Sequence, residues 1–223
     1  FTKGSVLGDK NGKTACDHYH RYKEDVALLK NLGIKNYRFS VSWSRIMPNG
    51  KGEINPEGVA FYSNLADELL KAGITPWVTI FHWDLPRALF EEGGFLNDKI
   101  SDYFADYAKT VVEIFGDRVK NYFIFNEPQV FVEDGHFTGA HAPFLRLSRS
   151  DVFKVAHNVL LSIGKAEKVM RKTAKIELDI GCSPCFTPMI TKRKEDAELA
   201  LKYNFTPNGE FYDGCFFTDA LIK

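Results

Sequence analysis

Apolar residues follow two alternating periodicities along the chain of 223 residues. Stretches in which they recur every three or four positions predict amphipathic helices, and short runs of β-branched and aromatic residues predict buried strands. The predicted helices begin at His20, after Asn55, after Asn97 or Ser101, and after Ser150. Gly33, Gly73 and Gly116 end the first three helices, as left-handed caps do. The predicted strands cover residues 34–41, 75–81, 121–125 and 176–181.

This alternation predicts βα units around a parallel sheet. No linker, low-complexity run or shift in composition divides the chain, so residues 1–223 are expected to form a single domain. Periodicity alone does not separate a barrel from an open, doubly wound sheet. No glycine-rich phosphate loop follows any predicted strand, and polar and aromatic residues follow several of them instead. That arrangement favours a barrel whose strands each contribute one part of a site.

Composition excludes several classes of function. Lys and Arg number 29, as do Asp and Glu, so no basic surface predicts a nucleic-acid partner. No apolar run approaches the roughly 20 residues that span a bilayer, so no membrane segment is expected. We expect neither metal nor cofactor, because the sequence has no metal cluster and no nucleotide-binding loop. The aromatic content, 14%, fits either bulky core filling or platforms for sugar rings.

Four cysteines are too few for a disulfide scaffold in a chain of this length. Cys182 and Cys185 form a CxxC pair, which lacks the second pair of a zinc ribbon and is expected to be structural. The chain starts at Phe1 rather than Met, which indicates a fragment or a processed product. Few cysteines and no signal region together predict a cytoplasmic location.

One segment predicts chemistry directly. An aromatic run ends in Phe125-Asn126-Glu127-Pro128, which places a carboxylate and an amide at the carboxyl end of a buried strand. Glu is rarely buried unless it is paired or used, and strand ends of parallel α/β folds open onto the catalytic face. The segment is therefore well placed to act on a ligand.

With four further stretches, this segment resembles glycoside hydrolase family one, the β-glucosidase family. The stretches occur in the family's order and spacing, and they cover residues 16–25, 37–46, 82–86 and 139–143. The resemblance implies a (β/α)8 TIM barrel and retaining hydrolysis of β-glycosides. It also implies that this chain holds about four βα units, barrel strands two to five, and lacks the first strand.

The resemblance assigns roles to five residues. Glu127 is similar to the general acid/base, which protonates the glycosidic oxygen and then activates water. Asn126 is similar to the amide that binds the sugar 2-hydroxyl, and His82 to the imidazole that binds sugar hydroxyls. Trp83 either lines the sugar pocket or packs beneath it. Arg38 resembles the strand-end arginine that orients the nucleophilic carboxylate.

Retaining hydrolysis needs a second carboxyl group about 5–5.5 Å from the first. The family carries it in a Thr-Glu-Asn-Gly motif on the seventh strand, and that motif is absent from this sequence. Glu177 and Asp179 flank the fourth predicted strand, but no family motif supports either as the nucleophile. Gln129 also departs from the family, since many members carry there a tryptophan that stacks on the leaving group. It leaves the aglycone preference open.

Four βα units leave sheet edges and an apolar inner face uncovered. A companion segment or self-association is therefore expected to complete the barrel around a β-glucoside or oligosaccharide. Two alternatives to the β-glucosidase reading stay open. One is a catalytically inactive fragment that binds sugar or a partner protein. The other is a 6-phospho-β-glucosidase. The resemblance argues against it, because family members that act on 6-phosphorylated sugars tend to lack the motifs found at residues 82–86 and 126–128.

Overall fold

The sheet has four parallel strands in the order β1-β2-β3-β4. A computed structural model of the protein describes residues 8, 12–185, 188–205, 216–218 and 220. The strands are β1 (Asn36–Ser40), β2 (Thr75–Phe81), β3 (Asn121–Asn126) and β4 (Asp179–Ser183). Neighbours in space are therefore also neighbours in sequence, which is the strand order of a barrel wall.

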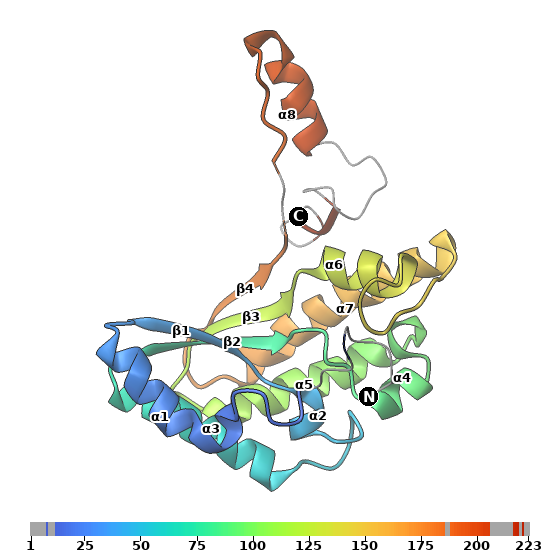
Figure 1. The fold of residues 1–223 in the computed structure, drawn as a ribbon. Coiled ribbons are helices and arrows are strands. Elements are labelled where there is room, and N and C mark those ends of the chain that lie inside the picture. The colour runs from blue at the N-terminus through green and yellow to red at the C-terminus, as the bar shows by residue number, and fades with distance from the viewer. Residues whose placement is uncertain (1–7, 9–11, 186–187, 206–215, 219, 221–223) are drawn as a thin grey trace.

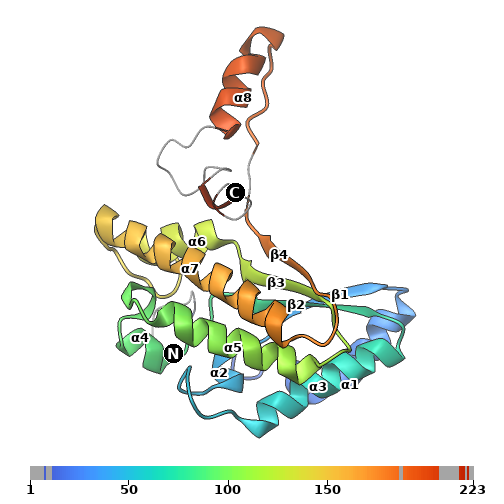
Figure 2. The same cartoon turned by 180° about the vertical axis from the view of Figure 1, so that it is seen from behind.

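The long helices lie on one face of this sheet (Figures 1 and 2). They are α1 (His18–Asn31), α3 (Pro56–Lys71), α5 (Ile100–Phe115) and α7 (Arg149–Thr173). Among the described residues, no helix covers the opposite face, which excludes a doubly wound sheet. The prediction of a partial (β/α)8 barrel is confirmed, and the open face corresponds to the inside of that barrel.

Short helices occupy the loops that follow the strands. They are α2 (Trp43–Ile46), α4 (Arg87–Glu91), η2 (Gly94–Leu96), α6 (Pro128–Val132), η3 (Glu133–Phe137) and η4 (Lys194–Asp196). The helix α8 (Ala197–Phe205) stands apart from the sheet beyond the carboxyl end of β4 (Figures 1 and 2). None of the helices that the structure describes is long and apolar enough to cross a bilayer.

Side chains on the two faces of the sheet differ in burial. Phe39, Val78 and Tyr122 are buried against the helices. Arg38 and Trp77 pair in register on neighbouring strands, and Arg38 is exposed whereas Trp77 is half-buried. The Trp77 ring stacks on Phe123 of β3 with centroids 5.7 Å apart. The open face therefore carries aromatic surface and one guanidinium.

A cluster of phenylalanines closes the carboxyl end of the sheet against its loops. Its members are Phe81, Phe95, Phe104, Phe125 and Phe131, all at most 2% exposed. The rings of Phe81 and Phe125 are 4.7 Å apart, and the ring of Phe131 is 5.5 Å from that of Phe125. These five rings fill the core and support the strand ends of β2 and β3.

Helix starts depend on capping residues, and only one of three predicted caps is confirmed. Asn55 caps α3, since its Oδ1 accepts a hydrogen bond from the amide of Glu57 at 3.1 Å. The cap of α7 is Ser148 rather than Ser150, because the Ser148 Oγ accepts from the Asp151 amide. The cap position of α5 is Lys99, so neither Asn97 nor Ser101 caps it.

Two strands are shorter or later than predicted. The strand β1 starts at Asn36 because the Ile34 amide donates to the Leu29 carbonyl and closes α1, with Gly33 at φ 74°. The strand β4 starts at Asp179 instead of Ile176. The reason is that the Leu178 carbonyl accepts from Arg171 of α7 at 3.0 Å, outside the sheet ladder.

Candidate functional site

Arg38 links β1, β2 and β3 on the side of the sheet where the strands end. Its Nη2 donates to the Asn126 Oδ1 on β3 at 2.7 Å, and its Nε donates to the Thr79 Oγ1 on β2 at 2.8 Å. The guanidinium also lies 4.6 Å from the ring centroid of Phe123. Because Arg has only donors, the bond fixes the Asn126 amide with its oxygen toward Arg38 and its Nδ2 donors elsewhere.

His82 follows β2 and lies near both Arg38 and Glu127. Its Nδ1 is 3.2 Å from the Ser40 Oγ at the end of β1. Burial, followed by the positive charge of Arg38, lowers the pKa of His82, and the negative charge of Glu127 opposes this shift. The imidazole is therefore held toward its neutral form, in which one nitrogen donates and the other accepts.

Trp83 contributes packing more than polar contacts to the site. Its backbone is left-handed, with φ 77°. Its indole Nε1 donates to the carbonyl of Asn126 at 2.8 Å. Its ring centroid is 5.7 Å from that of His141, and it borders a cavity of about 370 Å³ with Phe131 and Pro143. The single donor of Trp83 thus holds the end of β3 in place.

Glu127 directly follows β3 in a left-handed conformation, with φ 42° and ψ 64°. Such a backbone costs about 1–3 kcal/mol for a residue other than glycine, and it persists where the surroundings fix it. The Glu127 amide donates to the Ser183 carbonyl at the end of β4, at 2.7 Å. Pro128 then begins α6. The carboxylate is therefore positioned by a strained turn between β3 and α6 that is bonded to the end of β4.

The five candidate residues predicted from the sequence thus lie together near the carboxyl ends of β1, β2 and β3. Arg38 and Asn126 belong to β1 and β3, and His82 directly follows β2. Trp83 and Glu127 are their neighbours in the chain. Thr79 was missed by the sequence analysis, although a threonine inside an apolar strand is a detectable signal. It is fully buried beneath Arg38 and holds its Nε.

Asp84 is a second group without an assigned role from the sequence. Burial raises the pKa of its carboxyl group, and a hydrogen bond from the Ser42 side chain opposes that shift. It follows Trp83 in the chain and borders the same cavity. Asp84 is therefore a buried carboxyl group in the wall of this cavity.

Glu177 and Asp179 lie at the other end of the sheet. Asp179 is the first residue of β4 and pairs with the Nζ of Lys120 at 2.9 Å, while Ser183 at the far end pairs with Asn126. Four residues of a strand cover on the order of 13 Å, far more than the 5–5.5 Å between the two carboxyl groups of a retaining site. The geometry therefore sets both residues apart from Glu127.

The CxxC pair lies beside the site without a disulfide. The Cys182 Sγ–H donates to the Phe125 carbonyl at 3.2 Å, and burial raises the pKa of this thiol to about 11. Reactive thiols have lowered pKa values, so Cys182 is suited to packing rather than to redox chemistry. Across the part of the chain that the structure describes, no cluster of three or more His, Cys, Asp or Glu could hold a metal ion.

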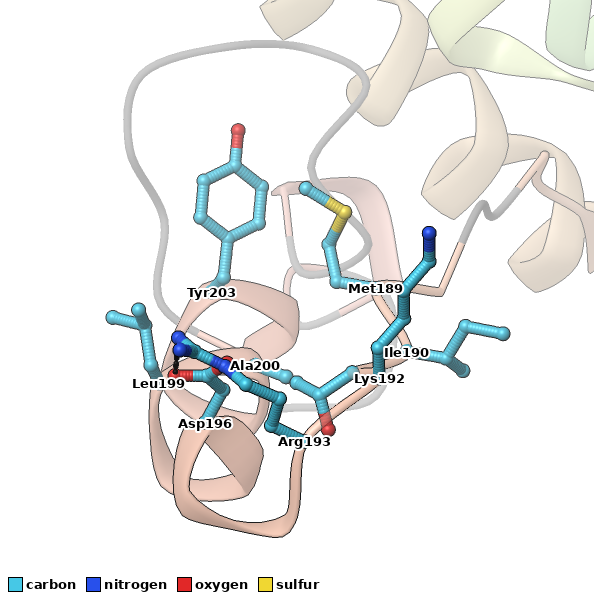
Figure 3. A pocket seen from close by; sticks show the side chains of 9 residues that line it. Met189, Ile190, Lys192, Arg193, Asp196, Leu199, Ala200 and Tyr203 are labelled. Carbon is cyan, nitrogen blue, oxygen red and sulfur yellow. Dashed lines mark hydrogen bonds and ion pairs between the residues drawn. The ribbon is translucent and has the colours of Figure 1, made fainter.

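A larger cavity of about 610 Å³ lies in the arm formed by η4 and α8 (Figure 3). Met189, Ile190, Leu199 and Tyr203 line it, and Ile190 is 90% exposed. The charged groups of Arg193 and Asp196 pair with each other at its border. None of the five candidate residues lines this cavity, so it is separate from the site at the sheet edge.

Comparison with known proteins gives one consistent match. The sequence model of glycosyl hydrolase family 1 matches residues 1–219. Beta-glucosidase A from Thermotoga maritima is 49% identical over 177 residues, which cover 78% of this chain and 39% of that protein. Beta-glucosidase A from Acetivibrio thermocellus is 41% identical over 95% of this chain and 47% of its own length. Myrosinase 1 from Brevicoryne brassicae is 42% identical over 217 residues. A relative with a different name thus matches this chain at a similar identity.

Solved structures agree with the sequence relatives. The beta-glucosidase from Thermotoga maritima in complex with noeuromycin superposes with a TM-score of 0.84 at 42% identity. The match covers 93% of this chain and 47% of that structure. The chain therefore spans less than half the length of the relatives it matches.

Proposed function

Because the chain belongs to glycosyl hydrolase family 1, we propose that it forms part of a retaining β-glucosidase in which Glu127 is the general acid/base. The observation that carries this proposal is the group of side chains around Glu127 at the sheet edge. Asn126 is bonded to Arg38, and His82 is close enough to Glu127 and Arg38 for their charges to shift its pKa. A carboxyl group, an amide and a neutral imidazole in one place suit the protonation and hydroxyl binding that glycoside hydrolysis needs.

Each neighbour of Glu127 has a role that follows from its bonds. The Arg38 bond directs the Nδ2 donors of Asn126 away from Arg38, free to bind a sugar 2-hydroxyl oxygen. The neutral His82 offers its Nε2 to other hydroxyls. Arg38 uses Nε and Nη2 within the chain, and its Nη1 donors suit a carboxylate that approaches the open face. Trp83 supports the pocket from beneath.

The nucleophile of this proposal lies outside the 223 residues. A companion segment that covers the open face would bring its carboxylate toward Glu127 and Arg38. Two carboxyl groups a few ångström apart resist joint ionisation, which would keep Glu127 protonated for its role as acid. The substrate of the completed barrel would be a β-glucoside or a related oligosaccharide.

The test co-expresses this chain, preceded by the first barrel strand of Beta-glucosidase A from Thermotoga maritima, with the carboxyl-terminal half of that relative. This complex is called the completed barrel. We expect hydrolysis of nitrophenyl β-glucoside and much weaker hydrolysis of its 6-phosphorylated form. In Glu127→Gln, kcat/KM for alkyl glucosides should fall about 10²–10⁴-fold, because general acid catalysis contributes that much. For dinitrophenyl glucoside it should fall far less, because this leaving group needs no proton.

Glu177→Gln is the matched control, since it neutralises an exposed carboxylate before β4. Its activity should equal that of the unmodified completed barrel. An equal loss on both leaving groups in Glu127→Gln would contradict the acid role. A completed barrel that binds glucoside without hydrolysing it would favour the second candidate, a sugar-binding fragment. That candidate is supported by the distance of Glu177 and Asp179 from Glu127.

A further inference from the structure

The side chain of Gln129 is buried inside the protein. Gln129 is the second residue of α6 and only 1% exposed. Its Nε2 donates to the carbonyl of Cys185 at 2.6 Å, and its Oε1 accepts from the Cys185 amide at 3.2 Å. Both halves of the amide are thus used by the backbone of one residue. An apolar side chain at this position would remove both hydrogen bonds from the partly buried backbone of Cys185.

The segment that Gln129 holds, Ser183–Cys185, also holds Glu127. The Ser183 carbonyl accepts from the Glu127 amide at 2.7 Å, and Ser183 pairs with Asn126 at the end of the sheet. Three of the four residues from 126 to 129 are therefore tied to one short segment. Since the left-handed backbone of Glu127 is costly, this segment is what stabilises it.

We propose that Gln129 is a positioning residue that locks the Ser183–Cys185 segment onto the first turn of α6 and thereby fixes the backbone of Glu127. The inference rests on the proposed role of Glu127 for its catalytic consequence, but its structural part stands without that role. Gln129 takes the place of an additional sheet bond, because its amide pairs with Cys185 as another peptide group would. The side chain is then a determinant of acid/base geometry rather than of the aglycone site.

The structural part is tested by hydrogen–deuterium exchange on this chain. Gln129→Met keeps most of the side-chain volume and removes both hydrogen bonds. We expect the amides of Cys185 and Glu127 to exchange about tenfold faster or more, while those of α5 stay unchanged. Asn158→Leu is the matched control, since it removes a buried amide that donates to the Phe95 carbonyl at 2.8 Å, away from this segment. It should leave the exchange of Cys185 and Glu127 unchanged.

The catalytic part is tested by kcat/KM of the completed barrel. A misplaced acid slows substrates that need a proton, so Gln129→Met should lower kcat/KM for an alkyl glucoside about 10- to 100-fold. For dinitrophenyl glucoside it should fall far less. Gln129→Glu retains an acceptor for the Cys185 amide but turns a carboxylate oxygen toward the Cys185 carbonyl, so it should not restore the ratio.

Each result has a distinct reading. Unchanged exchange in Gln129→Met, or a uniform increase that includes α5, would overturn the positioning role. An equal loss on both glucosides would show that Gln129 serves folding alone and would also overturn it. If the unmodified completed barrel is inactive, the proposed function fails, and the exchange experiment still decides whether Gln129 holds the segment.

Discussion

At the scale of single residues, Arg38 links parts of the chain that are far apart in sequence. Its two bonds reach Thr79 and Asn126, 41 and 88 residues away. A positive charge in this position has two effects. It fixes the orientation of the Asn126 amide, and it disfavours a second positive charge on His82. Arg38 thus sets both the hydrogen-bonding pattern and the protonation of its neighbours.

Titration of His82 reports on the charges around it. Its pKa should lie below the ordinary value of 6.5. Arg38→Met removes the nearby positive charge and should raise the His82 pKa, whereas Glu127→Gln removes the opposing negative charge and should lower it. NMR titration of the imidazole resonances measures both changes. Shifts in the reverse directions would contradict the arrangement of these three side chains.

The same shift has a consequence for stability. Below pH 6.5 the unfolded chain binds a proton at His82 before the folded chain does, so the free energy of unfolding should fall as the pH drops below that value. Well above pH 6.5 His82 is neutral in both the folded and the unfolded state, so its contribution to stability no longer changes with pH. The buried His136 also has a lowered pKa, so His82→Asn should flatten the decline without abolishing it. An unchanged decline in denaturant titrations across pH would contradict the His82 contribution.

At the scale of elements, the start of α7 separates two serines that the sequence does not distinguish. The Ser148 Oγ accepts from the Asp151 amide at 3.2 Å, while Ser150 already lies inside the helix. Ser148→Ala should therefore reduce the free energy of unfolding by about 1 kcal/mol. Ser150→Ala is the matched control and should change it by a few tenths of that at most. Urea unfolding of both variants measures the difference, and equal effects would contradict the cap assignment.

At the scale of the whole molecule, the sheet is a barrel wall with two free sides. Within the described residues, β1 and β4 each have one neighbour, and the open face carries Trp77 and Phe123. Such edges and aromatic surface favour pairing with another chain. The open face therefore explains why a companion segment or a second copy belongs to the proposed function.

We expect this chain of 25.3 kDa to associate with itself when it is purified alone. Light scattering coupled to gel filtration should give a mass of two copies or more, and the carboxyl-terminal half of the relative should convert it to a one-to-one complex. Trp77→Lys places a charge on the open face and should shift the mass toward one copy. Leu32→Lys changes an apolar residue that is 76% exposed beside α1 and should have no effect. A stable single copy of the unmodified chain would contradict this expectation.

The local sequence pattern was sufficient for the succession of helices and strands and for the residues that gather at the sheet edge. Helical spacing and strand runs depend on neighbours a few positions apart, so they can be read directly. Residues 125–128 and 82–83 were found because they belong to short motifs that resemble those of the family. The bond from Arg38 to Asn126 joins residues 88 positions apart and was not predicted from the sequence.

The sequence by itself determined the βα order, the core stripes and the identity of the candidate acid, because these depend on local periodicity and on short motifs. Only the tertiary structure decided that Ser148 caps α7, that β4 starts at Asp179, and that Gln129 bonds to the backbone of Cys185. These features depend on which distant backbone groups remain unpaired once the strands meet. That pairing is a property of the assembled fold, and no stretch of sequence contains it.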